Sequence, residues 1–193
     1  MLSEKLKNKH LILASGSPRR QHFLKELGLD HEIRLKEIEE NYPGHLKKEE
    51  ITDFLAKLKA SPFKNELKEN DILITADTIV WLNNKAIGKP KDQSDAVQML
   101  EKLSQNTHEV ISSVCLTSAT KQIVFSDVTK VTFKKLSEEE ILFYVNKYKP
   151  FDKAGSYGIQ EWIGYIGIEN INGSYFNVMG FPVYKFYREL MIF

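Results

Sequence analysis

The 193-residue sequence has very little cysteine and no long uninterrupted apolar run. Because Cys115 is its only cysteine, no disulfide can form within the chain, which is compatible with a reducing compartment. No stretch reaches the roughly 18 uncharged apolar residues expected of a membrane-spanning helix. The opening segment MLSEKLKNKH is charged, and no apolar segment typical of a secretory signal follows it. We therefore expect a cytoplasmic protein that has no membrane as a partner.

The sequence also lacks an excess of charge of either sign. It has 27 basic and 26 acidic residues, which give a formal net charge of +1. Proteins that bind DNA mainly through its phosphates usually show a basic excess, so the composition argues against nucleic acid as a partner. Apolar residues make up 42% of the chain, enough for a sizeable core. We expect one domain over residues 1–193, because no low-complexity linker divides the chain.

Several common catalytic motifs are absent as well. The five histidines lack the spacing of zinc ligands. Neither the G-x-S-x-G elbow of serine hydrolases nor the G-x-x-x-x-G-K-[ST] loop of P-loop proteins occurs. Cys115 lies in a strand-like run, where a small buried hydrophobic residue is a better interpretation than a nucleophile. The chemistry must therefore be sought elsewhere in the chain.

Strand-like and helix-like segments alternate along the chain and predict a mixed α/β fold, with a mixed twisted sheet and flanking helices. We expect strands over residues 11–15, 31–38, 72–82, 109–117 and 122–133. We expect helices over residues 18–27, 47–60, 93–103 and 137–148, and a last helix after Pro182. Asn83 and Asn84 favour a hairpin after the third strand, since both can adopt left-handed conformations. The glycine-rich tail from Phe151 is predicted to form short strands and turns.

The segment SGSPRR, residues 15–20, joins the first strand to the first helix. Ser17 suits the N-cap and Pro18 the first helical position, so backbone N–H groups gather there in a natural anion site. Arg19 and Arg20 follow in the first turn, where the helix dipole disfavours cations by up to about 1 kcal/mol. A bound anion would reverse that preference. A capped helix with two solvated arginines is an equally good interpretation of this segment alone.

Asp77 interrupts the otherwise apolar segment ILITADTIVWL, residues 72–82. A buried carboxylate is costly unless a metal, a cation or several donors meet it. We favour Asp77 as a metal ligand or general base. The alternative is a structural aspartate that accepts hydrogen bonds at a bulge.

Weaker signals come from single residues elsewhere. The acidic residues in the segment 37–40 usually indicate a solvated loop, although a phosphate–metal site needs a second carboxylate. Lys59 and Lys89, each considered alone, are expected to be solvated. In DKAGSYGIQ, residues 152–160, the glycines indicate tight turns or a close approach to a ligand. Gln160 has the donor and acceptor needed to bind the edge of a base, or else lies on the surface of a turn.

The quoted segments belong to a longer series that runs in one order along the chain: LASGSPRRQHFLKELGL, IEE, LAKLKA, ITADTIVWLNNKAIGKP, MLEKLSQNTHEVISSV, DKAGSYGIQ and INGSYFNVMGFPV. In this order and spacing the series resembles the Maf family, over about residues 11–183. The resemblance implies a nucleoside triphosphate pyrophosphatase that cuts between the α and β phosphates. It also implies an elongated two-lobed fold with a central cleft, similar to that of inosine triphosphatases, and a divalent metal, Mg²⁺ or Mn²⁺. A homodimer is compatible with it.

The resemblance also implies roles for single residues. The general base matches Asp77, and the carboxylates near the metal match Glu40 and Asp77. The substrate-contacting positions match Ser15, Ser17, Arg19, Arg20, Lys59 and Lys89. The positions linked to substrate choice match Arg19, Thr78 and Gln160.

Within the family, the form AGSYGIQ resembles the branch that acts on dTTP and UTP, because a sister branch has an acidic residue in place of Gln160. Glu161 departs from the pattern, which often has glycine there, so the rim of the base pocket is expected to differ. Two alternatives remain at this point. One is a pyrophosphatase for modified or purine triphosphates, and the other is a regulatory septum or cell-division protein that acts by binding.

Overall fold

The computed structural model describes residues 2–193, so the prediction of one domain over 1–193 includes a first residue that lies outside the described part. The contacts group the chain into two compact units. The first unit comprises Met1–Asp77, Ser112–Asp127 and Gly180–Phe193, and the second comprises Thr78–Ile111 and Val128–Met179. None of the helices formed by residues 2–193 combines the length and the apolar character needed to cross a lipid bilayer.

Within the described residues, seven strands form one mixed sheet in the order β2-β1-β3-β5-β6-β7, with β4 paired to β3. The strands are β1 (His10–Leu13), β2 (His31–Ile33), β3 (Asp71–Leu82), β4 (Lys85–Ile87), β5 (Thr107–Thr117), β6 (Gln122–Phe133) and β7 (Ile168–Asn172). β1 is parallel to β2 and β3, whereas β4 is antiparallel to β3 and β7 to β6. The predicted mixed α/β fold is therefore confirmed.

The helices predicted over residues 18–27, 47–60, 93–103 and 137–148 and after Pro182 are present, while the first helix and the two short helices of the tail were not predicted. The helices are α1 (Leu2–Lys5), α2 (Pro18–Glu26), α3 (Glu49–Ala60), α4 (Gln93–Leu103), α5 (Glu138–Tyr148), α6 (Trp162–Gly167), α7 (Tyr175–Val178) and α8 (Val183–Ile192), with 3-10 turns η1 (Ser61–Phe63) and η2 (Ala154–Ser156). The capping box is present, because Ser137 Oγ accepts from the Glu140 N–H and the Glu140 carboxylate accepts from the Ser137 N–H. Asn83 and Asn84 have positive φ values, as the hairpin requires.

One strand is shorter than predicted. The strand expected over residues 31–38 ends at Ile33, and its partner β1 ends at Leu13. The chain turns after Leu13 towards α2, so the pairing beyond Ile33 is limited to the Arg34 N–H, which donates to the Leu13 carbonyl at 3.1 Å. The prediction from local composition was wrong there because a strand needs a partner of matching length.

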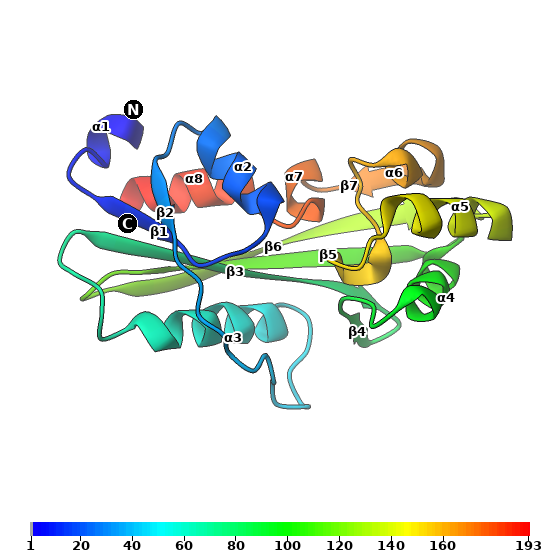
Figure 1. Cartoon of the computed structure of the whole chain (residues 1–193), viewed down its shortest axis with the longest axis horizontal. Coiled ribbons are helices and arrows are strands. Elements are labelled where there is room, and N and C mark those ends of the chain that lie inside the picture. Colours follow the sequence, from blue (N-terminus) through cyan, green and yellow to red (C-terminus); the bar gives the residue numbers. More distant parts are fainter. Residues whose placement is uncertain (1) are drawn as a thin grey trace. The chain divides into compact units, whose positions relative to one another are not determined.

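In the first unit, helices cover both faces of the sheet. Figure 1 shows α2 and α8 on one face and α3 on the other. Phe23 of α2 stacks on Phe181 at 6.3 Å between ring centroids, and Phe181 in turn contacts Phe186 of α8. On the other face, a core cluster joins α3 to the strands and includes Cys115, which is fully buried. Burial raises the pKa of the Cys115 thiol, which agrees with its interpretation as a hydrophobic core residue.

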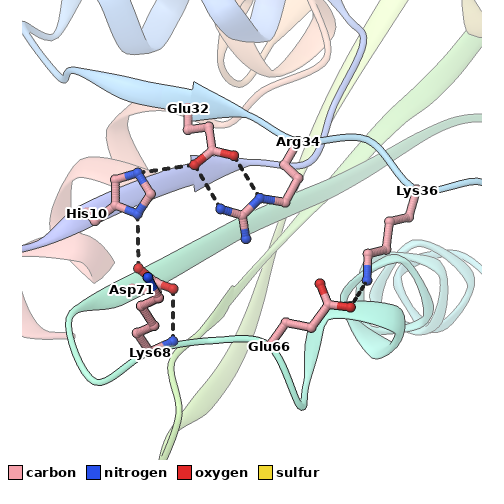
Figure 2. Close-up of polar contacts among 7 residues, drawn as sticks. All are labelled: His10, Glu32, Arg34, Lys36, Glu66, Lys68 and Asp71. Atoms are coloured by element: carbon pink, nitrogen blue, oxygen red, sulfur yellow. Dashed lines mark hydrogen bonds and ion pairs between the residues drawn. The ribbon is translucent and has the colours of Figure 1, made fainter.

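A polar cluster connects the parallel strands of the first unit (Figure 2). His10 Nδ1 lies 2.9 Å from Asp71 Oδ1, and His10 Nε2 lies 3.3 Å from Glu32 Oε2. Arg34 donates two hydrogen bonds to the Glu32 carboxylate, at 2.7 and 2.8 Å. Burial alone would raise the pKa of Asp71, but hydrogen bonds from the Lys68 N–H and His10 outweigh it and lower that pKa. The cluster thus links β1, β2 and β3 through their side chains.

The second unit has its own core. α4 packs against α5 and η2, and their apolar side chains join those of the strands in one buried cluster. Within it, His108 is buried, with its Nε2 2.7 Å from the Tyr157 hydroxyl and its ring stacked on Phe133. Burial lowers the pKa of His108 to about 4, so its imidazole is neutral at physiological pH. His108 is therefore a core residue of this unit.

Candidate active site

Two carboxylates and an ammonium group gather in the first unit. Lys59 Nζ lies 2.7 Å from Asp77 Oδ1 and 2.9 Å from Glu40 Oε2. Asp77 is only 7% exposed, and its second oxygen, Oδ2, is buried with no hydrogen-bond partner among the described residues. The single ammonium offsets only part of the negative charge of the two acids, and Asp77 Oδ2 keeps its lone pairs available to a donor or a cation.

The packing of α3 on β3 explains why Lys59 reaches Asp77. Every residue of β3 before Thr78 is buried, so Asp77 is held on a rigid strand. Ala56 and Ala60 of α3 are buried and small, which lets the helix approach the sheet closely. The hydroxyl of Thr75 donates to the Ala56 carbonyl at 2.6 Å. This bond fixes the helix against the strand two residues before Asp77, which sets the position of Lys59 in the next turn.

Arg20 braces the backbone on the other side of Asp77. Its Nη1 donates to the Ala76 carbonyl at 2.8 Å, and its Nε donates to the Gly180 carbonyl at 3.0 Å. A third, longer contact joins Nη1 to Ser15 Oγ at 3.4 Å. Burial lowers the pKa of Arg20, and the negative charge of Asp77 opposes that shift only in part. At least two donors of this guanidinium are therefore used to hold the chain beside Asp77.

The start of α2 agrees with the prediction in its backbone but not in its capping bond. Ser17 occupies the N-cap and Pro18 the first helical position, as predicted, but the Ser17 side chain makes no capping hydrogen bond. Instead the Ser17 N–H donates to Ser15 Oγ at 3.3 Å. Arg19 is half-buried in the same turn. The helix ends at Glu26 with Leu27 as its C-cap, and the following Gly28 has a φ of 67°, as predicted for a glycine after the last turn.

The remaining predicted site residues belong to the second unit. Thr78 is the residue after Asp77 in β3, and Lys89 is exposed in the segment after β4. Gln160 is half-buried, and its Oε1 is buried without a hydrogen-bond partner in the part of the chain that the structure describes. The Gly155 N–H donates to the Gly88 carbonyl at 3.0 Å, which ties the segment of Lys89 to the segment of Gln160.

The structure brings several predicted site residues of the first unit together. Asp77, Glu40 and Lys59 form one contact group, and Arg20 and Ser15 border it through Ala76. The sequence did not point to Thr75, Gly180, Tyr144 or Lys153, whereas Glu161, which packs with Tyr144 and Lys153 at the turn of Gln160, was expected to alter the rim of the base pocket. Gly180 lies in the quoted motif INGSYFNVMGFPV, but it acts through its carbonyl oxygen, for which residue type gives no signal.

The carboxylates fit a hard divalent cation. Mg²⁺ is commonly bound through one or two carboxylates, with substrate phosphates and water completing its octahedral shell. Asp77 Oδ2 is a buried oxygen without a hydrogen-bond partner among the described residues, and Glu40 supplies a second carboxylate nearby through the shared Lys59. Across the described residues, no three His, Cys, Asp or Glu side chains gather as a complete metal-binding cluster. The donor set therefore suits a metal that arrives with a phosphate ligand.

Sequence comparisons match known proteins over nearly the whole chain. The sequence model of a family described as Maf-like protein matches residues 10–193. A dTTP/UTP pyrophosphatase of Flavobacterium johnsoniae is 60% identical over 190 residues, covering 98% of each chain. A dTTP/UTP pyrophosphatase of Flavobacterium psychrophilum is 61% identical over 191 residues, covering 99% of this chain and 98% of the relative. Among solved structures, the Ham1 protein of Staphylococcus aureus aligns with a TM-score of 0.49 and 18% identity, covering 82% of this chain and 91% of that one.

Proposed function

Because the chain belongs to the Maf family, we propose that it hydrolyses dTTP and UTP between the α and β phosphates, giving the monophosphate and pyrophosphate. The relatives named dTTP/UTP pyrophosphatase support this substrate class through their high identity and nearly complete coverage. The observation that carries the proposal is the buried Asp77 carboxylate, which contacts Lys59 and keeps one oxygen without a partner among the described residues. A group of this kind suits the activation of water beside a phosphorus atom.

Asp77 is proposed as the general base, with Lys59 as the cation that balances its charge. A carboxylate held on a buried strand keeps its orientation, which is what proton transfer in a single geometry requires. Lys59 contacts both Asp77 and Glu40, so it also determines the separation of the two acids. The bonds from Thr75 to Ala56 and from Arg20 to Ala76 support this arrangement from both sides.

A divalent metal, Mg²⁺ or Mn²⁺, is proposed as the cofactor, held by Asp77 and Glu40 together with the substrate. When bound, such a cation neutralises phosphate charge and lowers the pKa of a coordinated water. The protein's own contribution is to present two carboxylates at one place and to keep Lys59 beside them.

The triphosphate brings about four negative charges, and we expect the start of α2 to receive part of them. At this helix start lie Ser15, Ser17 and Arg19, and the Arg20 guanidinium contacts Ser15 Oγ. Lys59, and Lys89 in the second unit, are proposed as further phosphate contacts. This assignment explains why two arginines occupy the first turn of a helix, where the dipole alone disfavours cations.

Gln160, with Thr78, is proposed to recognise the base. Uracil and thymine present an N3–H donor beside a carbonyl acceptor, and a carboxamide can pair with both. The buried Gln160 Oε1, which has no partner among the described residues, supports this role because an acceptor of this kind gains most from a ligand donor.

The test is a product analysis with a panel of substrates. The purified protein is incubated with Mg²⁺ and each of dTTP, UTP, CTP, GTP and modified triphosphates, and the products are separated by ion exchange. We expect dTMP or UMP with pyrophosphate, and faster turnover of dTTP and UTP than of purine triphosphates. Diphosphate with orthophosphate as the main products would exclude the proposed cleavage. We further propose a cytoplasmic role in clearing the nucleotide pool, carried out by one domain over residues 1–193.

A further inference from the structure

A buried polar network surrounds the turn that carries Gln160. The Lys153 side chain is only 10% exposed and the Glu161 side chain 19%, and Lys153 Nζ lies 3.1 Å from Glu161 Oε1. The Tyr144 hydroxyl donates to the other oxygen of Glu161, and the Tyr144 ring is fully buried. The Tyr144 hydroxyl oxygen in turn accepts from the Gly158 N–H at 2.9 Å. All four residues belong to the second unit.

This network closes the turn from both ends. The Glu161 N–H donates to the Gly158 carbonyl at 3.0 Å, so the backbone of the turn is already fastened once. A second link between the same two residues runs through side chains. The Tyr144 hydroxyl accepts from the Gly158 N–H and donates to the Glu161 carboxylate. Gln160 lies between the two anchors and has little freedom to move its backbone.

The packing over Gly158 places the side chain of Gln160 next to that of Glu161. A Cβ atom added at Gly158 would lie 2.9 Å from Gln160 Nε2, 2.8 Å from Glu161 Cδ and 3.0 Å from Glu161 Oε2. Both side chains therefore fold over the same glycine, and the Glu161 carboxylate limits the space open to the Gln160 amide. A displacement of the carboxylate would release that amide.

Stability alone gives little reason for this arrangement. A buried ion pair loses the hydration of both charges, and replacing it with well-packed apolar residues is often neutral or stabilising. Burial also raises the pKa of Tyr144 further above its ordinary value, and the nearby Glu161 adds to that shift, so the hydroxyl remains a donor at any physiological pH. What the network does provide is one fixed orientation for the turn and for the side chain folded against it.

We propose that Glu161, held by Lys153 and Tyr144, is a positioning residue that orients the Gln160 amide for recognition of the pyrimidine base. This inference rests on the proposed function, since it presumes that Gln160 contacts the base. An amide oriented before the substrate binds loses less side-chain freedom on binding, which favours the matching base over its competitors. Glu161 does not touch the substrate in this proposal and acts only through Gln160.

The test compares substrate ratios in two variants of the network. Glu161→Gln keeps the size of the side chain and removes one of the two carboxylate charges that Lys153 meets, the other being that of Asp152 at 2.7 Å. Tyr144→Phe removes only the hydroxyl. For both we expect the ratio of kcat/KM for UTP to kcat/KM for CTP to fall about tenfold, mainly through a higher KM for UTP, with kcat changed little. Tyr144→Phe keeps the ring, so it remains informative if Glu161→Gln fails to fold.

Glu140→Gln is the matched control. Glu140 also pairs with a lysine of the second unit, Lys134 at 2.7 Å, but it caps α5 and does not touch the turn. We expect this variant to lower the melting temperature and to leave the UTP to CTP ratio unchanged. An unchanged ratio in folded Glu161→Gln and Tyr144→Phe would overturn the inference while the pyrophosphatase proposal stands. A wild-type protein that cleaves neither UTP nor dTTP would overturn both.

Discussion

Lys59 Nζ lies 2.7 Å from Asp77 Oδ1, although the two residues come from different elements, the last turn of α3 and the middle of β3. The same ammonium lies 2.9 Å from Glu40 Oε2, so one cation serves two carboxylates. Removing it would leave two negative charges facing each other in a partly buried site. The contact therefore affects both the binding of a polyanionic substrate and the position of Asp77.

Lys59→Met keeps the length of the side chain and removes its charge. We expect kcat/KM for UTP to fall about 100-fold, the scale seen when one charge-stabilising group of an active site is lost. Lys57→Met is the control, because Lys57 is on the same helix and exposed. Steady-state kinetics and a melting curve of each variant check the expectation. Equal activity of the two variants would show that Lys59 has no part in the reaction.

Asp77→Asn keeps the shape of the side chain and removes its negative charge. We expect turnover to fall by at least about 100-fold, because loss of general-base catalysis has this magnitude. Circular dichroism should show an unchanged fold, since an amide can still accept a hydrogen bond from Lys59. Near-normal turnover in a folded variant would reject the role of Asp77.

Arg20→Lys separates a bracing role from simple phosphate binding. A lysine keeps the charge but lacks the rigid fork that reaches both the Ala76 and the Gly180 carbonyls. We expect a loss of about 1–3 kcal/mol in the free energy of unfolding, the cost of leaving buried acceptors without donors. Urea denaturation measures it, with the exposed Arg188→Lys as control. A higher KM with unchanged stability would indicate that Arg20 serves only as a phosphate ligand.

Gln160→Glu tests base recognition directly. A carboxylate can accept from the N3–H of uracil, but it has no donor for the O4 carbonyl and places a negative charge against it. We expect activity on UTP and dTTP to fall roughly ten- to a hundredfold more than activity on other bases, which corresponds to about 1–3 kcal/mol. The measurement is kcat/KM for UTP, CTP and GTP with both proteins. If the ratios among these substrates do not change, Gln160 does not recognise the base.

The polar cluster of Figure 2 predicts how stability depends on pH. Burial would raise the pKa of Asp71, but bonds from the Lys68 N–H and His10 and the charge of Arg34 lower it. Because the pKa of Asp71 is lower in the folded state, its carboxylate stabilises the fold, and this contribution is full above the unfolded-state pKa of about 3.9. The contribution is lost as the pH falls through the lower pKa that Asp71 has in the folded state. His10 contacts the Asp71 carboxyl group and, through its other ring nitrogen, Glu32, which completes the cluster.

Asp71→Asn should therefore be less stable than the wild type near neutral pH, and its stability should fall less steeply with pH below about 4. Thermal melts over a series of acidic buffers check both expectations. Asp30→Asn is the control, because Asp30 is exposed and lies outside the cluster. Parallel acid transitions of the wild type and Asp71→Asn would contradict the role assigned to Asp71.

Local sequence signals were sufficient for elements whose bonds lie within a few residues. The helix predicted over 93–103 matches α4, and the capping box of Ser137 and Glu140 starts α5 where expected, because such bonds join residues three or four positions apart. Apolar composition also located β3, which is almost wholly buried, and β6, most of whose residues are only half-buried. The tail was less predictable: α6 and α7 are too short to be stable alone, so they depend on packing that local composition does not describe.

By itself, the sequence determined that Asp77 would be a carboxylate inside an apolar strand and that Ser17 and Pro18 would start a helix. Only the tertiary structure decided which groups meet them. Lys59 is 18 positions from Asp77, and Gly180 is 160 positions from Arg20, so their contacts depend on how α3, β3 and the C-terminal segment pack. The same holds for Tyr144 and Glu161, which are 17 positions apart. Residue type sets which bonds a side chain can form, whereas packing of distant segments sets which partner lies within reach.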